Sequence, residues 1–473
     1  MQYTDNLQIT SGYFASFDKL NTFLRSFLSL CRLQGVVSDL RSVYCRKAII
    51  RLLVFAKFLE YKSVHHLIRS DYCALINCGK DVYYSAKNNI NINWRNVLRQ
   101  QAKECLSYMN PMDFDAKKAH QTPCLIVDDS DIKKCGKLIE MIGKIFSHKL
   151  HKYILGFKSL NLVLWTGKTC VNIDFSLHVE KRKDGRQGLT KKEFENRCSR
   201  VRKEKSHGEK RIKESLSKKT TLLIQMIKGA LKNGIQAPYL LVDSWFFNSK
   251  LVAFVKQSPL DLISRVKLNN WNYAYEGKAY TIGQLIQKLK NHRKRKWSRK
   301  LRMHYVCITV EFKGHILNLH LYKPKKRGSK WYVLVSTKKG LSSIKVYELY
   351  QNRWSIEVTY KELKQHFGYG KSQSRDFSGQ IADHTICLMA FNIMSTFKSI
   401  NEYESIGALF THVKQSWIRP SVMELFWQLI MEVANKISEI FDLDVKMIVS
   451  VVLKDNEILK IFNLNQLLLT TET

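Results

Sequence analysis

Residues 124–129, CLIVDD, form a short apolar run that ends in two acids, and they begin the segment that decides the fold. Two further strand-like runs within 160–179, LNLVLWTG and TCVNIDFSLHV, are joined at a Thr-Gly-Lys sequence typical of a hairpin. A helix is predicted over 219–234, because KTTLLIQMIKGALKNG ends in a glycine. The run YLLV and its acid occupy 239–243, and 251–266 contain a further helix and strand. This order predicts a mixed α/β sheet covered by helices.

The predicted sheet is interrupted and then resumed. Residues from about 268 to 330 are polar and strand-like, which predicts an inserted β-rich subdomain. The run WYVLVST restores the buried-strand pattern, and SIKVYELYQNRWSIEVTYKELKQHFG, residues 343–368, is predicted to form one long helix. Helical patterns dominate residues 1–118 and 401–473. We therefore expect helical regions at both ends of a central domain that covers 119–400.

The composition indicates a folded protein with a polyanionic partner. The 473 residues are 45% hydrophobic and 11% aromatic, so the chain can bury real cores and is not disordered. No apolar run approaches the roughly 20 residues of a membrane span, and we expect no secretory signal. The 11 scattered cysteines favour reduced thiols in the cytosol over zinc sites or disulfides. The net charge of +38 indicates nucleic acid as the partner.

Two acids stand at the ends of apolar strands, Asp129 after CLIVD and Asp243 after YLLV. The carboxyl ends of strands are where sheets of this kind carry ligands and chemistry. Asp128 and Asp131 flank Asp129, so the pattern leaves open which of these acids is functional. A structural role is the alternative, because an Asp that ends a strand often forms only a turn or a cap.

Four polar residues share one face of the predicted long helix. They are Tyr350, Arg353, Glu357 and Lys364. At 100° per residue they fall within an arc of about 60°, beside the apolar stripe that would dock on the sheet. Ion pairs on a solvated helix face are one explanation of this pattern. They do not explain why a carboxylate borders the packing stripe, framed by cations, in a chain with two strand-end aspartates upstream.

The spacing Tyr350-x2-Arg353-x3-Glu357-x6-Lys364 resembles, position for position, the Y-R-E-K signature of the insertion sequence four family of DDE transposases. A β-rich insertion between the second catalytic Asp and the Glu is also this family's arrangement. The resemblance covers about residues 119–400 and implies a ribonuclease H-like catalytic domain. It implies a transposase that cleaves DNA strands and transfers them, in cut-and-paste transposition of an insertion sequence.

The resemblance implies a site of three carboxylates, Asp129, Asp243 and Glu357, that are both catalytic residues and metal ligands. Asp129 is followed by Ser and is similar to the family's first catalytic Asp, while Asp243 is similar to its second. The implied cofactor is Mg²⁺, with Mn²⁺ as a substitute, as two ions. Hard cations of this kind prefer carboxylate oxygens. Two ions about 3.5–4 Å apart can activate the nucleophile and neutralise the leaving oxygen of a phosphodiester.

DNA-binding residues follow from the same resemblance. It implies that Tyr350, Arg353 and Lys364 hold the end of the element, with Arg353 as a bidentate phosphate ligand and Lys364 as a point charge. Trp331 lies about two residues from the place where family members carry a Trp that stacks on a flipped base; a core Trp at a strand start is the alternative. Three basic runs suit contacts with the DNA backbone: residues 181–219, 288–300 and 323–330.

The expected partners are double-stranded DNA, as terminal inverted repeats and as target, and a second copy of the chain in a homodimer. Residues 1–118 are the candidate for binding DNA ends, and residues 401–473 are the candidate for dimerisation. We expect the protein in the bacterial cytoplasm, at the nucleoid, and not in a membrane. Two alternatives remain: a non-catalytic DNA-binding protein derived from a transposase, and an RNA-binding scaffold whose acids balance charge.

Overall fold

The computed structural model describes residues 25–36, 43–59, 61, 63–70, 78–109, 118–182, 188–292, 295–326, 328–401, 405–412, 433–445, 447 and 451. The chain forms two compact units, one of residues 30–408 and one of residues 1–29 with 409–473. In the second unit, residues 433–441 are helical. Most of the predicted C-terminal helical region, and the predicted N-terminal helix before residue 25, lie outside the described residues.

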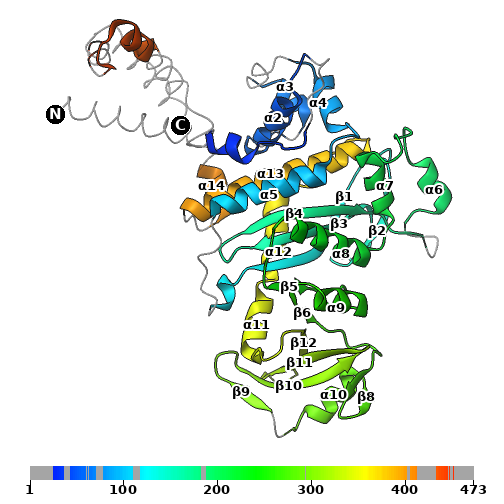
Figure 1. The fold of residues 1–473 in the computed structure, drawn as a ribbon. Helices are drawn as coiled ribbons and strands as arrows, with labels where there is room; N and C mark the ends of the chain where they lie inside the picture. Colours follow the sequence, from blue (N-terminus) through cyan, green and yellow to red (C-terminus); the bar gives the residue numbers. More distant parts are fainter. Residues whose placement is uncertain are drawn as a thin grey trace, which may run out of the picture. The chain divides into compact units, whose positions relative to one another are not determined.

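A mixed sheet forms the centre of the larger unit (Figure 1). Its first six strands are β1 (Cys124–Lys133), β2 (Gly143–Ser147), β3 (Lys152–Trp165), β4 (Cys170–His178), β5 (Tyr239–Val242) and β6 (Asp261–Arg265). β3 pairs antiparallel with β1 and with β4, whereas β5 pairs parallel with both β1 and β6. β4 and the first half of β1 consist of buried residues, as a sheet covered on both faces requires.

Helices cover this sheet. Those that contact its strands include α5 (Trp94–Met109), α7 (His207–Ser215), α8 (Lys219–Lys232), α9 (Ser249–Lys256), α12 (Trp354–His366) and α13 (Phe377–Asn401). α8 shows how the sequence produces this packing, because its buried residues recur at helical spacing: Leu222, Leu223, Met226, Ile227 and Ala230. α8 packs on β3 and β4, α5 and α13 pack on β4, and α12 packs on β1.

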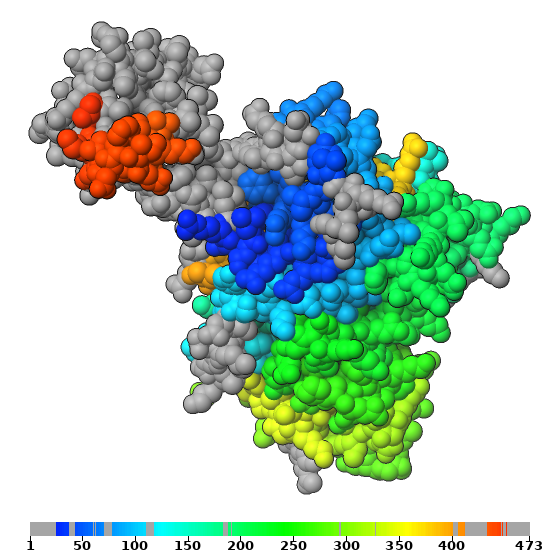
Figure 2. All heavy atoms as spheres, turned by 45° about the horizontal axis from the view of Figure 1, so that its top comes forward, coloured from blue at the N-terminus to red at the C-terminus, as the bar shows by residue number. Residues whose placement is uncertain are grey.

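The helices upstream of residue 118 pack against α13 rather than apart from the sheet. They are α2 (Arg46–Phe58), α3 (Val64–Ile68), α4 (Lys80–Lys87) and α5. α2, α4 and α5 each contact α13, and Figure 2 shows their blue surface continuous with the cyan and green surface of the sheet domain. These helices therefore share the larger unit with the sheet. The domain boundary expected at residue 118 stays a prediction.

The β-rich insertion lies between β6 and β12 (Tyr332–Ser336). It contains β7 (Tyr273–Tyr275), β8 (Lys278–Tyr280), α10 (Ile282–Leu289), β9 (Lys296–Ser298), β10 (Met303–Phe312) and β11 (His315–Pro324). β12 pairs antiparallel with β11 on one side and with β6 on the other. The insertion therefore extends the central sheet, and its two ends lie side by side.

The helix predicted over 343–368 is divided in two. α11 (Ser343–Gln351) and α12 are separated at Asn352 and Arg353. The side chain of Asn352 donates a hydrogen bond to the backbone oxygen of Ala119 at 2.8 Å, and its own backbone oxygen accepts one from the Ser355 hydroxyl at 2.7 Å. Hydroxyl groups that bond backbone carbonyls compete with the helical ladder. Periodicity does not reveal this break because both linking residues keep helix-like dihedral angles.

The remaining short elements of the described chain are a 3-10 turn at Ala119–Gln121, α6 (Lys191–Asn196) and α14 (Ile406–His412). The antiparallel β4, β3 and β1, followed by the parallel β5 and β6, confirm the predicted mixed α/β class and are consistent with a ribonuclease H-like transposase domain. No helix among the described residues is long and apolar enough to cross a membrane.

Candidate active site

Two adjacent parallel strands bring Asp128 and Asp243 to one edge of the sheet. Val127 of β1 is paired with Val242 of β5, so the residue that follows each of them occupies an equivalent position. Paired residues of parallel strands point to the same face, because side chains alternate with a period of two. Asp128 and Asp243 interact electrostatically, which fits this placement. Asp128 therefore lies within β1, at the point where its parallel pairing with β5 ends, and Asp243 directly follows β5. The strand end predicted after the first acids is wrong, because β1 continues to Lys133 through its pairing with β3.

Asp129 points to the other face of β1. Its carboxylate forms an ion pair with Lys219, at the start of α8, and the two side chains are 29% and 14% exposed. Although burial opposes ionisation, the Lys219 ammonium holds the pKa of Asp129 below its usual range. Between Asp128 and Asp129, the structure directs Asp128 toward α12 and Asp129 toward α8.

Arg353 joins Asp128 to Glu357 on the α12 side. Its guanidinium donates to the Asp128 carboxylate at 3.0 Å and to the Glu357 carboxylate, one helical turn later, at 2.5 Å. The hydroxyl of Tyr360, also in α12, donates to the backbone oxygen of Asp128 at 2.9 Å. These contacts fix α12 over the middle of β1. Sequence reasoning placed Glu357 near a strand-end Asp, and the structure brings it to Asp128 through Arg353.

The environment of Asp128 disfavours its ionised form. Burial raises the pKa of Asp128 to about 7, opposed by the Arg353 guanidinium and reinforced by the negative charges of Asp129 and Asp243. Like charges in a shared site raise a carboxyl pKa, and a cation bound there would lower it again. Asp128 is thus a carboxylate whose charge depends on a cationic neighbour.

The donor chemistry of this edge fits a hard divalent cation. Asp128, Asp243 and Glu357 supply carboxylate oxygens, which are the ligands that Mg²⁺ prefers. As they stand, no three acidic, His or Cys side chains within the described parts of the chain are grouped closely enough to hold a metal ion. The Arg353 guanidinium lies between two of the three carboxylates. A cation shared by all three requires that this guanidinium move aside.

The other two residues of the Y-R-E-K pattern contact the protein backbone. Tyr350 is buried, and its hydroxyl donates to the Val242 backbone oxygen at 3.3 Å. Burial raises the pKa of Tyr350 to about 12. Lys364 donates to the Ser130 hydroxyl at 2.7 Å and to the Asp131 backbone oxygen at 3.1 Å. Both residues therefore border the ends of β1 and β5.

Trp331 is half-buried and lies directly before β12. The next residue, Tyr332, faces the candidate site: its ring lies 5.1 Å from the Arg265 guanidinium and 6.3 Å from the Tyr350 ring. Of the three basic runs, residues 183–187, 293–294 and 327 lie outside the described residues. The roles expected for Trp331 and for these runs stay predictions.

Sequence reasoning did not single out two residues near the candidate site, Trp245 and Lys219. Trp245 is half-exposed, two positions after Asp243, and the Lys219 ammonium lies 5.1 Å from its ring. The signal for Trp245 was present, because a large aromatic residue directly after a strand-end acid falls in a loop at the edge of the sheet. The pairing of Lys219 with Asp129 depends on how α8 returns to β1, which no local pattern contains.

One comparison with known proteins bears on this geometry. A family model described as Transposase DDE domain matches residues 216–393. The matched segment includes Asp243, Arg353 and Glu357, while β1 with Asp128 and Asp129 lies upstream of it. No curated protein matches the chain. The matched segment supports a DDE transposase.

Proposed function

We propose that the protein is a transposase of the insertion sequence four family that cleaves and transfers DNA strands with the help of divalent metal ions. The observation that carries this proposal is the placement of Asp128 and Asp243 directly after the paired residues of two adjacent parallel strands, with Asp128 joined to Glu357 through Arg353. The match of residues 216–393 to a transposase DDE domain supports it.

In this proposal Asp128 replaces Asp129 as the first carboxylate. Asp128, Asp243 and Glu357 would hold two Mg²⁺ ions, which activate the attacking oxygen and stabilise the leaving oxygen of a phosphodiester when bound. Asp129 instead pairs with Lys219 and fixes the start of α8 against β1. Asp128 and Asp129 cannot exchange these roles, because neighbouring side chains of a strand point to opposite faces of the sheet.

The cations of α12 would bind DNA. Arg353, once displaced from the carboxylates, presents a planar two-pronged donor suited to a phosphate. Lys364 adds a positive charge beside Ser130 at the same edge. Tyr350 and Trp331 are proposed to contact the element end and a flipped base. The partners in this proposal are terminal inverted repeats, target DNA and a second copy of the chain, in the bacterial cytoplasm.

A non-catalytic DNA-binding protein derived from a transposase is the second candidate. The observation that favours it is the Arg353 guanidinium, which satisfies Asp128 and Glu357 as a metal would. If the cation cannot displace Arg353, the chain keeps its DNA-binding surfaces and loses the chemistry.

A nicking assay separates the two candidates. The full chain is incubated with Mg²⁺ and a duplex that carries the inverted repeats flanking its gene, and cut strands are resolved on a denaturing gel. Glu357→Gln should remove cleavage and leave binding of the duplex nearly intact, because Gln keeps the shape and loses the charge. Glu362→Gln, in the same helix, is the matched control and should cleave normally. Cleavage retained by Glu357→Gln contradicts the metal-dependent site.

A further inference from the structure

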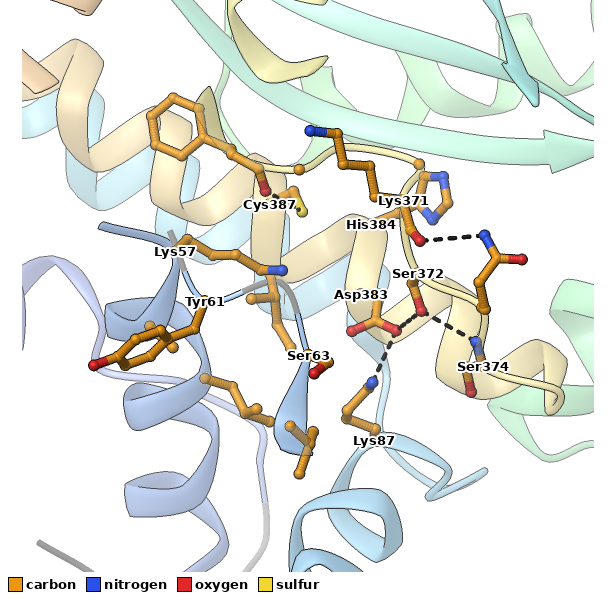
Figure 3. Close-up of a pocket in the computed structure, with 18 of the residues that line it drawn as sticks. Lys57, Tyr61, Ser63, Lys87, Lys371, Ser372, Ser374, Asp383, His384 and Cys387 are labelled. Carbon is orange, nitrogen blue, oxygen red and sulfur yellow. Dashed lines mark hydrogen bonds and ion pairs between the residues drawn. The ribbon is translucent and has the colours of Figure 1, made fainter. Parts of the chain in front are cut away.

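A pocket lies at the far end of α12 from the carboxylates, between the N-terminal helices and the start of α13 (Figure 3). Its volume is about 820 Å³. α2, α3 and α4 form one wall, and the chain from 365 to 376 forms another. From Glu357 to His366, which lines the pocket, α12 advances roughly 14 Å at 1.5 Å per residue. The pocket is therefore separate from the carboxylate site and joined to it by one helix.

One carboxylate in this pocket faces several cations. Asp383 of α13 forms an ion pair with Lys87 at 2.8 Å, and these side chains are 12% and 6% exposed. The Lys57 ammonium points into the same pocket, and it interacts with Asp383 and with the Cys387 thiol. Burial raises the pKa of Cys387, so this thiol stays neutral. Asp383 is thus shared between two lysines.

A third ammonium lies behind the pocket wall. Lys134 is buried, and it donates to the backbone oxygens of Gly370 and Ser372 at 2.8 and 2.7 Å. Burial lowers the pKa of Lys134 to about 8, although Asp383 opposes this. The Ser372 hydroxyl donates to the same Asp383 carboxylate. Three ammonium groups therefore depend on one negative charge.

The second acid of the pocket does not neutralise the excess positive charge of the three lysines. Among the described lining residues, that acid is Asp376, and its carboxylate pairs with Arg200 at 2.7 Å and Arg202 at 3.0 Å. Exposed Lys371 and Arg375 add further positive charge at the rim. Charges withdrawn from water are stable only when they are paired and hydrogen-bonded. An anion bound in the pocket would supply the missing negative charge for these ammonium groups.

We infer that this pocket binds a backbone phosphate of DNA, an inference that rests on the proposed function. A phosphodiester has one negative charge and oxygen acceptors that suit the ammonium groups and the serine hydroxyls along the wall. The site formed by Asp128, Asp243 and Glu357 holds the scissile phosphate at one end of α12. The pocket lined by Lys57 holds another phosphate of the same DNA at the other end. Free inorganic phosphate has the same chemistry and is tested beside it.

The test compares the salt dependence of DNA binding among three variants of the full chain. Lys57→Met removes a pocket ammonium, Lys371→Gln removes an exposed rim charge without disturbing the interior, and Lys47→Met in α2 is the matched control away from the pocket. Each lost phosphate contact lowers the slope of log affinity against log salt by about one unit. We expect this loss for Lys57→Met and Lys371→Gln and an unchanged slope for Lys47→Met. Native slope and affinity in both pocket variants overturn the inference.

Inorganic phosphate provides the second arm. Melting temperatures are measured in sodium phosphate and in sodium chloride of equal ionic strength, because a ligand that binds the folded state raises the melting temperature. A phosphate effect that Lys57→Met removes, with DNA slopes unchanged, overturns DNA as the source and assigns the pocket to free phosphate. Nicking is scored on the same duplex. If DNA binding depends on Lys57 but the native chain does not nick the duplex, the pocket is supported and the proposed catalysis is contradicted. If the native chain nicks the duplex but both pocket variants keep the native salt slope, the catalysis is supported and the pocket is contradicted.

Discussion

Arg353 is the residue that, in the proposed function, would couple DNA binding to chemistry. In the present arrangement its guanidinium neutralises Asp128 and Glu357 together. In the proposed function the same group must leave before a cation can be shared by the three acids, and it then becomes available to a phosphate. DNA that draws Arg353 away from the carboxylates would therefore also open them to metal.

The choice between the two neighbouring aspartates of β1 is testable by substitution. Asp128→Asn should lower the rate of strand cleavage on the order of 1,000-fold, which is about 4 kcal/mol of transition-state stabilisation. Asp129→Asn should cleave within about tenfold of the native chain, because a part-exposed ion pair contributes about 1 kcal/mol or less. Single-turnover nicking rates decide the matter. Loss of cleavage in Asp129→Asn alone would return the role to Asp129.

The phosphate-binding role of α12 is a separate prediction. Arg353→Ala and Lys364→Ala should each weaken binding of element-end DNA and lower the salt slope by about one unit. The loss should be larger for Arg353, since a planar two-pronged donor is not replaced by a nearby lysine. Fluorescence anisotropy over a range of salt concentrations measures both quantities. Unchanged affinity and slope would limit these residues to their contacts within the protein and contradict a phosphate-binding role.

At the scale of elements, the strands were more predictable than the helix that carries the signature. CLIVDD and YLLVD identified β1 and β5 because buried strands are apolar, although β1 continues past its acids to Lys133. The break between α11 and α12 escaped prediction, because it depends on a hydrogen bond from Asn352 to Ala119, which is 233 residues away in sequence. The angular arc predicted for one continuous helix still placed Arg353 and Glu357 together, since both lie on the α12 side of that break.

α13 is joined to the sheet by a buried amide. The Asn392 side chain accepts a hydrogen bond from the Asn172 backbone nitrogen at 2.7 Å and donates to the Asn172 backbone oxygen at 2.9 Å. These bonds lie beside the position where the register of β3 and β4 shifts.

Asn392→Ala should therefore destabilise the fold by roughly 2–4 kcal/mol, because it leaves two buried backbone groups without partners. We expect the urea midpoint of Asn392→Ala to be lower than that of the native chain when unfolding is followed by far-UV circular dichroism. Ile400→Ala in the same helix removes a half-exposed side chain and should change stability by about 0.5 kcal/mol or less. Equal midpoints for Asn392→Ala and the native chain would show that water satisfies these groups.

At the scale of the whole molecule, the residues proposed for the chemistry could be named from the sequence, whereas their contacts could not. The types and spacing of Asp243, Arg353 and Glu357 indicated phosphoryl transfer before any fold was known. The preference for Asp128 over Asp129 required the register of β1 against β5, and the cluster around Asp383 required four separate segments to meet. Periodicity describes which face a residue occupies, but not what the rest of the chain brings to that face.

The pH dependence of stability is a further property of the whole molecule. Burial lowers the pKa of His320 to about 4 and that of His384 to about 3. The unfolded chain binds these protons near pH 6.5, so it holds more protons than the folded chain below that pH, and the free energy of unfolding falls as the pH falls. Each histidine should contribute up to about 1.4 kcal/mol per pH unit between about pH 6 and its folded pKa.

His320→Gln and His384→Gln should each flatten the fall in unfolding free energy between pH 6 and pH 4, whatever they do to absolute stability. Urea titrations at several pH values measure this slope. His65→Gln, at an exposed position, should keep the native slope. A native slope in both buried variants would show that other groups govern acid unfolding.

The pairing of β6 with β12 has a consequence for how such a protein can change over evolutionary time. Because the chain departs and re-enters on hydrogen-bonded neighbours, the two points of attachment stay about 5 Å apart whatever lies between them. Lengthening a closed segment costs little, about 0.6 kcal/mol per doubling. The subdomain from β7 to β11 can therefore be lengthened, shortened or replaced while the strands that carry the acids remain unchanged.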